Sequence, residues 1–199
     1  LIPLLTKCGL KSDNLFREII GNKKYKGTKF GIPYFTLLDR LTFPLAFDGV
    51  INNFYGRATW KTDFKHRKLD VANGQYGHGG YNLQVLNGVD DEVILAESAL
   101  DALSLISMGY SNTVAVIGVT NYTILEAIIA SGKNIAAALN NDEAGHKAAD
   151  RLAKWLTEVQ GQQKFRNFTT DFFQQHNSPD DLIHTDYNDW WKNIGRFKR

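Results

Sequence analysis

The sequence of 199 residues contains a single cysteine, Cys8. One thiol cannot build a disulfide framework, and it also excludes the zinc sites that need several cysteines, so no zinc is expected within this chain. A reducing compartment fits this composition, and we expect a cytoplasmic protein. The chain begins with Leu1 rather than Met, so we interpret it as a piece of a longer polypeptide.

Long apolar runs are missing as well. No stretch approaches the roughly 18 apolar residues of a membrane span, and no charged and apolar leader precedes a small-residue cleavage site. We therefore expect no membrane partner. Apolar residues still make up 43% of the chain and aromatic residues 12%. That is enough for a sizeable core in one domain or in two small ones.

The net charge of the whole chain is only +2, but the charge is uneven along the sequence. Residues 1–90 hold 13 Lys and Arg against 7 Asp and Glu, whereas residues 91–199 hold 10 against 14. A basic half beside an acidic half suggests that one part binds a polyanion while the other binds cations. Chance variation in a solvated surface is the alternative, and the count alone does not decide between them.

Strands and helices alternate in the second half of the sequence. Strand-like runs at 93–97, 113–118 and 134–139 are followed by helical patterns at 98–108, 121–130 and 143–159, with a last strand expected at 164–170. This alternation predicts an α/β fold of βαβ units, with a mostly parallel, Rossmann-like sheet and flanking helices. In such sheets the loops at the carboxyl ends of the strands form the ligand-binding edge.

Acidic residues follow three of these strands. Glu97 ends the first, Asp142 follows the third, and Asp180 or Asp181 follows the last. Converging carboxylates repel one another unless a cation lies between them, and a hard divalent cation is the usual solution. Mg²⁺, or Mn²⁺ in its place, suits phosphoryl or nucleotidyl transfer because it keeps substrate phosphates as ligands. One such acid alone is more often a helix cap, but acids after three of the strands favour a metal site.

The first half combines cations with aromatic side chains. Beside Trp60 and Phe64, the segment 56–68 holds five cations: Arg57, Lys61, Lys65, Arg67 and Lys68. Phosphates attract such cations and unpaired bases stack on the rings, which suits single-stranded nucleic acid. A lysine-rich surface loop with aromatic residues in the core is the alternative.

Several short motifs occur in an order and spacing typical of one family. "ESALDALSL" follows a strand as a Glu-x-x-x-Asp motif, "NNDEAGHKAA" stands where an Asp-x-Asp motif precedes Ala-Gly, and "SPDDLI" stands where Asp-Pro-Asp occurs. Upstream, "FPLAFDGVINNFYGR" is similar to a Phe-Pro-Ile hairpin that ends in Gly-Arg, and its Asp-Gly pair is a strong hairpin signal. With these motifs the chain resembles the TOPRIM catalytic fold and, within it, the bacterial DnaG-type primases.

The resemblance implies a TOPRIM domain at residues 90–199 and a small mixed α+β basic subdomain at residues 1–89. It also implies roles for individual residues. Glu97 would be the catalytic residue, as metal ligand or general acid/base. Asp101 would support the site without binding the metal itself. The implied metal ligands are Glu97, Asn140, Asp142 and Asp180.

The implied activity is that of a DNA primase, a nucleotidyltransferase that makes short RNA primers during DNA replication. Its metal-dependent core would use ribonucleoside triphosphates and a single-stranded DNA template. A replicative helicase would be a partner through regions outside this sequence.

Three positions depart from the family pattern. Asn140 and Ser178 stand where the family has aspartates, and Ser98 stands where glycine commonly follows the catalytic glutamate. An amide carbonyl still binds a hard cation but brings no charge, so it weakens a metal site. Two other functions therefore stay open: a degenerate TOPRIM module that binds nucleic acid without catalysis, and a TOPRIM nuclease that breaks phosphodiesters with the same metal cluster.

Overall fold

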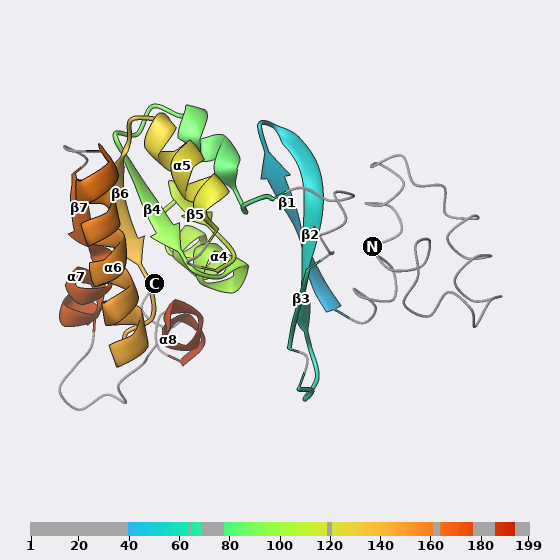
Figure 1. The fold of residues 1–199 in the computed structure, drawn as a ribbon. Helices are drawn as coiled ribbons and strands as arrows, with labels where there is room; N and C mark the ends of the chain where they lie inside the picture. The colour runs from blue at the N-terminus through green and yellow to red at the C-terminus, as the bar shows by residue number, and fades with distance from the viewer. Residues whose placement is uncertain are drawn as a thin grey trace. The chain divides into compact units, whose positions relative to one another are not determined.

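The computed structural model describes residues 40–63, 65–68, 78–118, 121–160, 164–176 and 186–193. The chain divides into two compact units, Leu1–Gly79 and Gly80–Arg199 (Figure 1). The domain bounds 1–89 and 90–199 stay a prediction. Among the described residues, none of the helices has the length and apolar character needed to cross a membrane.

The first unit contains a three-stranded antiparallel sheet in the order β1-β2-β3. Its strands are β1 (Arg40–Phe47), β2 (Val50–Ala58) and β3 (His66–Lys68). Asp48 and Gly49 form the two-residue turn between β1 and β2, with positive φ angles of 54° and 76°. Asp-Gly adopts this conformation readily, which confirms the predicted hairpin. The short strand β3 was not predicted.

The second unit contains a four-stranded sheet in the order β5-β4-β6-β7, and every neighbouring pair of strands is parallel. Its strands are β4 (Glu92–Ala96), β5 (Thr113–Ala115), β6 (Asn134–Ala138) and β7 (Phe165–Asn167). The helices among its described residues are η2 (Leu83–Asn87, a 3-10 helix), α4 (Ala99–Ser107), α5 (Tyr122–Ala130), α6 (Glu143–Gln160), α7 (Phe168–His176) and α8 (Tyr187–Asn193). The predicted parallel α/β sheet with flanking helices is confirmed.

The helices cover both faces of the parallel sheet. Within the sheet, β5 lies on one side of β4 and is reached through α4. The strands β6 and β7 lie on the other side of β4 and are reached through α5 and α6. Since such crossovers are right-handed, the reversal of direction places α4 on one face and α5 and α6 on the opposite face. Consistent with this, α5 and α6 line one cavity together with Leu95 of β4. The central strands are apolar and buried because neither face meets solvent.

The last strand is shorter than predicted. Strand was expected over 164–170, but β7 ends at Asn167 and α7 begins at Phe168. The Asn167 side chain accepts a hydrogen bond from the Thr170 backbone N–H (3.2 Å), as a helix N-cap does. The Thr169 hydroxyl donates to the carbonyl of Leu139 (2.6 Å). These side-chain bonds start a helix in a segment whose β-forming residues favoured a strand.

Candidate functional site

The connections after β4 and β6 meet at one edge of the parallel sheet. These strands are neighbours in register, with Ala96 opposite Ala138. Glu97 directly follows β4, and Asn140 and Asp142 follow β6. Because the chain leaves the two strands towards opposite faces, their carboxyl ends form a topological switch point, where α/β sheets bind ligands. The structure therefore brings these three predicted site residues to the same part of the fold.

The loop after β6 holds Asp142 in a defined position. One carboxylate oxygen of Asp142 accepts a hydrogen bond from the Gly145 backbone N–H (2.7 Å), so Asp142 caps the start of α6. Gly145 is required there, because a Cβ atom at this residue would lie 2.0 Å from the carbonyl oxygen of Asn140. The Asp142 side chain remains exposed, so the hydrogen bond from the Gly145 backbone holds it in place while it faces solvent.

Glu97 and Asp142 interact through their charges. Burial, and then the negative charge of Asp142, raises the pKa of the half-buried Glu97 carboxyl. The backbone of Glu97 is fixed by a hydrogen bond from the Gly118 N–H to its carbonyl oxygen (3.2 Å). Two carboxylates that repel each other at a ligand-binding edge can be relieved by a cation.

Asp101 lies in the first turn of α4 and is only 7% exposed. The Ser98 hydroxyl donates to its carboxylate (2.5 Å) and accepts from its backbone N–H (3.2 Å). The carboxylate also accepts a hydrogen bond from the backbone N–H of Asn188 in the first turn of α8. Ser98, a departure from the family pattern, therefore caps α4 and holds the acid that joins α4 to α8.

A fourth carboxylate, Asp186, was missed from the sequence. Burial, and then the negative charge of Asp186, raises the pKa of Asp101 to about 6, although the hydrogen bond from Ser98 acts in the opposite direction. Asp186 also accepts from the Asp189 backbone N–H (2.7 Å) as the cap of α8. In the sequence it looks like any helix-capping acid, so only the packing of α8 against α4 reveals its proximity to Asp101.

The raised pKa of Asp101 predicts a pH-dependent effect on stability. Below about pH 4 the Asp101 carboxyl is protonated in both the folded and the unfolded state. Between about pH 4 and pH 6 it ionises freely only in the unfolded state, so the free energy of unfolding falls as pH rises. Asp101→Asn removes the ionisation but weakens one hydrogen bond. We expect the variant to gain about 2 kcal/mol in free energy of unfolding at pH 7.5 and little at pH 4. Denaturant unfolding at both pH values checks this, and a gain independent of pH would contradict it.

The residues at this edge fit a hard divalent cation. Glu97 and Asp142 offer charged oxygen atoms, and the half-buried Asn140 offers a neutral amide oxygen. Asp180, the remaining predicted ligand, lies outside the described residues. Among the residues that the structure does describe, no three His, Cys, Asp or Glu side chains are grouped so as to hold a metal ion. The ligand roles of Glu97, Asn140, Asp142 and Asp180, and the supporting role of Asp101, stay predictions.

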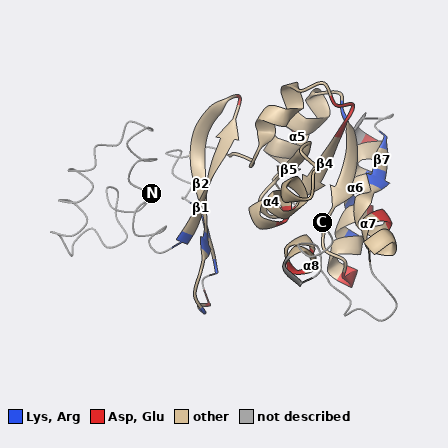
Figure 2. Ribbon diagram, turned by 180° about the vertical axis from the view of Figure 1, so that it is seen from behind, with Lys and Arg blue, Asp and Glu red and all other residues tan. Residues whose placement is uncertain are grey.

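The predicted nucleic-acid-binding residues lie on both faces of the small sheet and in the connection between β2 and β3. Residues paired across antiparallel strands share a face, so the register places Lys68 with Tyr55 and Arg57 with His66. Arg67 pairs with Gly56 and lies on the other face. Lys61 and Lys65 belong to the connection between β2 and β3. Lys and Arg gather at the end of the sheet away from the β1–β2 turn (Figure 2).

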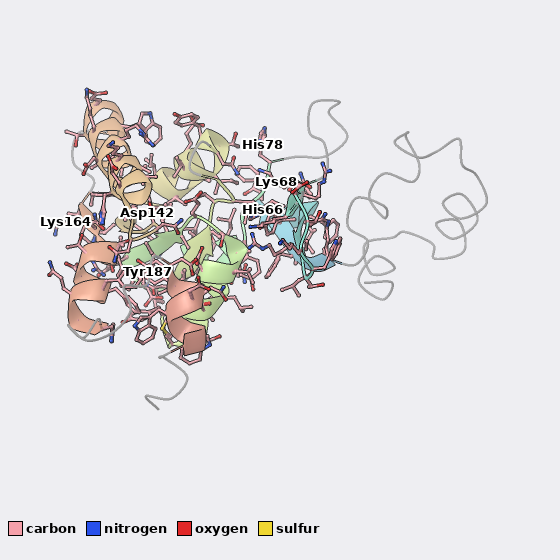
Figure 3. All side chains as sticks on the ribbon, turned by 90° about the horizontal axis from the view of Figure 1, so that it is seen from below. His66, Lys68, His78, Asp142, Lys164 and Tyr187 are labelled. Atoms are coloured by element: carbon pink, nitrogen blue, oxygen red, sulfur yellow. The ribbon has the colours of Figure 1, made fainter. Side chains whose placement is uncertain are left out.

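A histidine on β3 holds one of these cations. The Nε2 atom of His66 lies 2.5 Å from a terminal nitrogen of Arg57, and its Nδ1 atom lies 2.6 Å from the Tyr55 hydroxyl. Burial, and then the charge of Arg57, lowers the pKa of His66. A neutral imidazole can accept a hydrogen bond from the guanidinium, so Arg57 is oriented by its neighbour across the strands. His66 and Lys68 project from the same short strand (Figure 3).

Comparison with known proteins gives consistent results. Residues 94–183 match the Toprim-like family. The DNA primase of Pseudomonas putida is 29% identical over 168 residues, which cover 80% of this chain and 25% of that protein. The chain thus spans a quarter of the length of this curated relative.

Solved structures of primases share the fold. The zinc-binding and RNA polymerase domains of Aquifex aeolicus primase align with 98% of this chain and 44% of that one, at a TM-score of 0.59 and 20% identity. A DnaG primase catalytic domain bound to single-stranded DNA aligns with 83% of this chain and 61% of that one, at a TM-score of 0.57 and 18% identity. The predicted TOPRIM α/β fold is confirmed, and the described part of the predicted small α+β subdomain is the three-stranded antiparallel sheet.

Proposed function

We propose that this chain, which has the TOPRIM fold and resembles the catalytic cores of bacterial primases, is the catalytic core of a DNA primase. Its activity would be that of a DNA-directed RNA polymerase that synthesises short RNA primers on single-stranded DNA from ribonucleoside triphosphates. The matched primases include one whose catalytic domain was solved with single-stranded DNA, which supports this choice of template.

One observation carries the proposal: Glu97 and Asp142 follow neighbouring strands at the switch point between β4 and β6, and the charge of Asp142 adds to burial in raising the pKa of Glu97. Such a pair is poorly explained by helix capping alone, because capping accounts for Asp142 and not for Glu97. The match to the Toprim-like family spans both residues.

Each part of the fold has a proposed task. Glu97, Asp142, Asn140 and Asp180 would hold Mg²⁺ or Mn²⁺, which when bound neutralises triphosphate charge and helps a 3′-hydroxyl attack the α-phosphorus. Asp101 would keep α4, and with it Glu97, in place through its bonds to Ser98 and Asn188. The cations of the small sheet would hold the template by its phosphates.

The experiment that tests the function separates it from its two alternatives. In one reaction, a 5′-labelled single strand of DNA is incubated with the protein, Mg²⁺ and ribonucleoside triphosphates. In a parallel reaction the strand is unlabelled and the ribonucleoside triphosphates carry the label. New labelled RNA is the expected result. Shortening of the strand would instead identify a nuclease, and binding of the strand without either product would identify a non-catalytic module.

The departure at Asn140 gives a prediction about metal binding. Asn140→Asp places an anion beside Asp142 and should strengthen the attraction for Mg²⁺, whereas without the cation the added charge repels Asp142 and lowers stability. Calorimetric titration should show tighter Mg²⁺ binding, by about tenfold, and synthesis at limiting Mg²⁺ should rise.

The matched control is Asn134→Asp, which adds the same charge at the opposite end of β6. It should leave the affinity for Mg²⁺ close to that of the parent chain, because it lies a full strand away from the switch point. Equal or weaker affinity in Asn140→Asp would mean that residue 140 does not face the metal.

A further inference from the structure

An exposed tryptophan lies beside the cations of the small sheet. Trp60 follows the end of β2 and leaves 45% of its surface exposed. Its ring offers a large apolar surface that a ligand can cover. The guanidinium of Arg40 lies over the ring, 5.2 Å from its centre.

The ring and the cation are held in place by the sheet. A terminal nitrogen of Arg40 donates a hydrogen bond to the carbonyl of Lys65 (3.1 Å), which fixes the guanidinium across the connection between β2 and β3. The cation–π contact in turn orients the ring of Trp60. A stacking surface that is oriented before the ligand arrives costs less entropy to use than a mobile one.

A second cation lies on the same face. Arg40 pairs with Ala58 and Arg67 pairs with Gly56, and residues 56 and 58 point to one side of β2, so the two arginines share that side. Burial, and then the charge of Arg67, lowers the pKa of Arg40, which shows that the two guanidiniums repel each other. An anion near both would remove this repulsion.

We propose that Trp60 is a stacking platform for one unpaired base of single-stranded nucleic acid, with Arg40 and Arg67 placed to receive the neighbouring phosphates. The ligand class follows from the combination of an accessible aromatic face and two cations on one side of a sheet. This inference rests on the proposed function and deepens it, since it assigns base contact to Trp60 and phosphate contact to an arginine pair.

The test compares two ligands that differ only in their bases: an oligothymidylate and an abasic deoxyribose-phosphate strand of the same length. Binding of the 199-residue chain to both is measured by fluorescence anisotropy for the parent and for Trp60→Ala, Trp60→Leu and Trp60→Phe. We expect roughly a tenfold loss of oligothymidylate affinity for the Ala and Leu variants, a small loss for Phe, and unchanged affinity for the abasic strand. The salt dependence should stay the same, because no phosphate contact is removed.

The outcomes separate the inference from the function on which it rests. Equal losses on both strands would show that Trp60 only supports the fold of its loop, and no loss on either would show that no base stacks there; both overturn the inference while binding to single strands persists. If Trp60→Ala does not fold, the difference between Leu and Phe still decides, since both keep apolar bulk but only Phe keeps a ring. A parent chain that binds neither strand overturns the inference and the template-binding part of the proposed function together.

Discussion

Glu97→Gln is expected to reduce template-dependent primer synthesis by at least about 10²-fold. The amide keeps the shape of the side chain but removes the charge that holds a divalent cation and the capacity to move a proton. The fold should remain intact, because the folded protein already disfavours the ionised form, as the raised pKa of Glu97 shows. Primer synthesis by the purified variant, with thermal unfolding as a measure of folding, checks both statements.

The matched control for this change is Glu126→Gln on the exposed side of α5. It removes the same charge from the same unit but lies away from the switch point, so synthesis should be unchanged. A folded Glu97→Gln variant with full activity would rule out Glu97 as the catalytic residue. Equal loss in both variants would indicate a general effect of charge rather than a site.

Gly145→Ala is expected to destabilise the second unit by about 3 kcal/mol or more. The added methyl group would lie 2.0 Å from the carbonyl oxygen of Asn140 and 2.8 Å from its carbonyl carbon. These are backbone atoms, so the first turn of α6 must move away from the end of β6. The melting temperature should fall by about 10 °C or more.

The same movement should disturb the candidate metal site, since the Gly145 N–H is the hydrogen-bond donor to Asp142. Weaker Mg²⁺ binding should therefore accompany the loss of stability. Gly88→Ala serves as the control: its Cβ would meet only the Val85 carbonyl, at 3.1 Å, and its φ of −77° suits alanine. An unchanged melting temperature in Gly145→Ala would mean that the loop after β6 is not packed as described.

Much of the fold could be predicted from the periodicity of apolar residues and the order of the strands. The alternation of apolar runs and helical stripes led directly to β4, β6 and their helices, since buried parallel strands read as continuous apolar segments. The rule that ligands bind at carboxyl strand ends then placed Glu97 and Asp142 at one edge, and the register of β4 and β6 agrees with it. Asp48-Gly49 gave the hairpin because few dipeptides adopt two consecutive positive φ angles.

Other features depended on contacts that no local pattern contains. The segment Phe168–Thr170 has the composition of a strand, yet Asn167 caps a helix there and Thr169 bonds to the end of β6. Asp186 resembles an ordinary cap until α8 packs against α4 and places it near Asp101. The division of the basic residues between two faces, with Arg57 on one and Arg67 on the other, follows only from the register of β3.

The measurement that tests the central claim most directly is the sequence of the RNA that the chain makes on defined templates. The 199-residue protein is incubated with Mg²⁺, all four ribonucleoside triphosphates and single-stranded DNA templates that differ in sequence, and the products are sequenced. The account predicts short RNA complementary to each template, abolished by Glu97→Gln and dependent on the divalent cation. RNA unrelated to the template, or synthesis that persists in a folded Glu97→Gln variant, would contradict it.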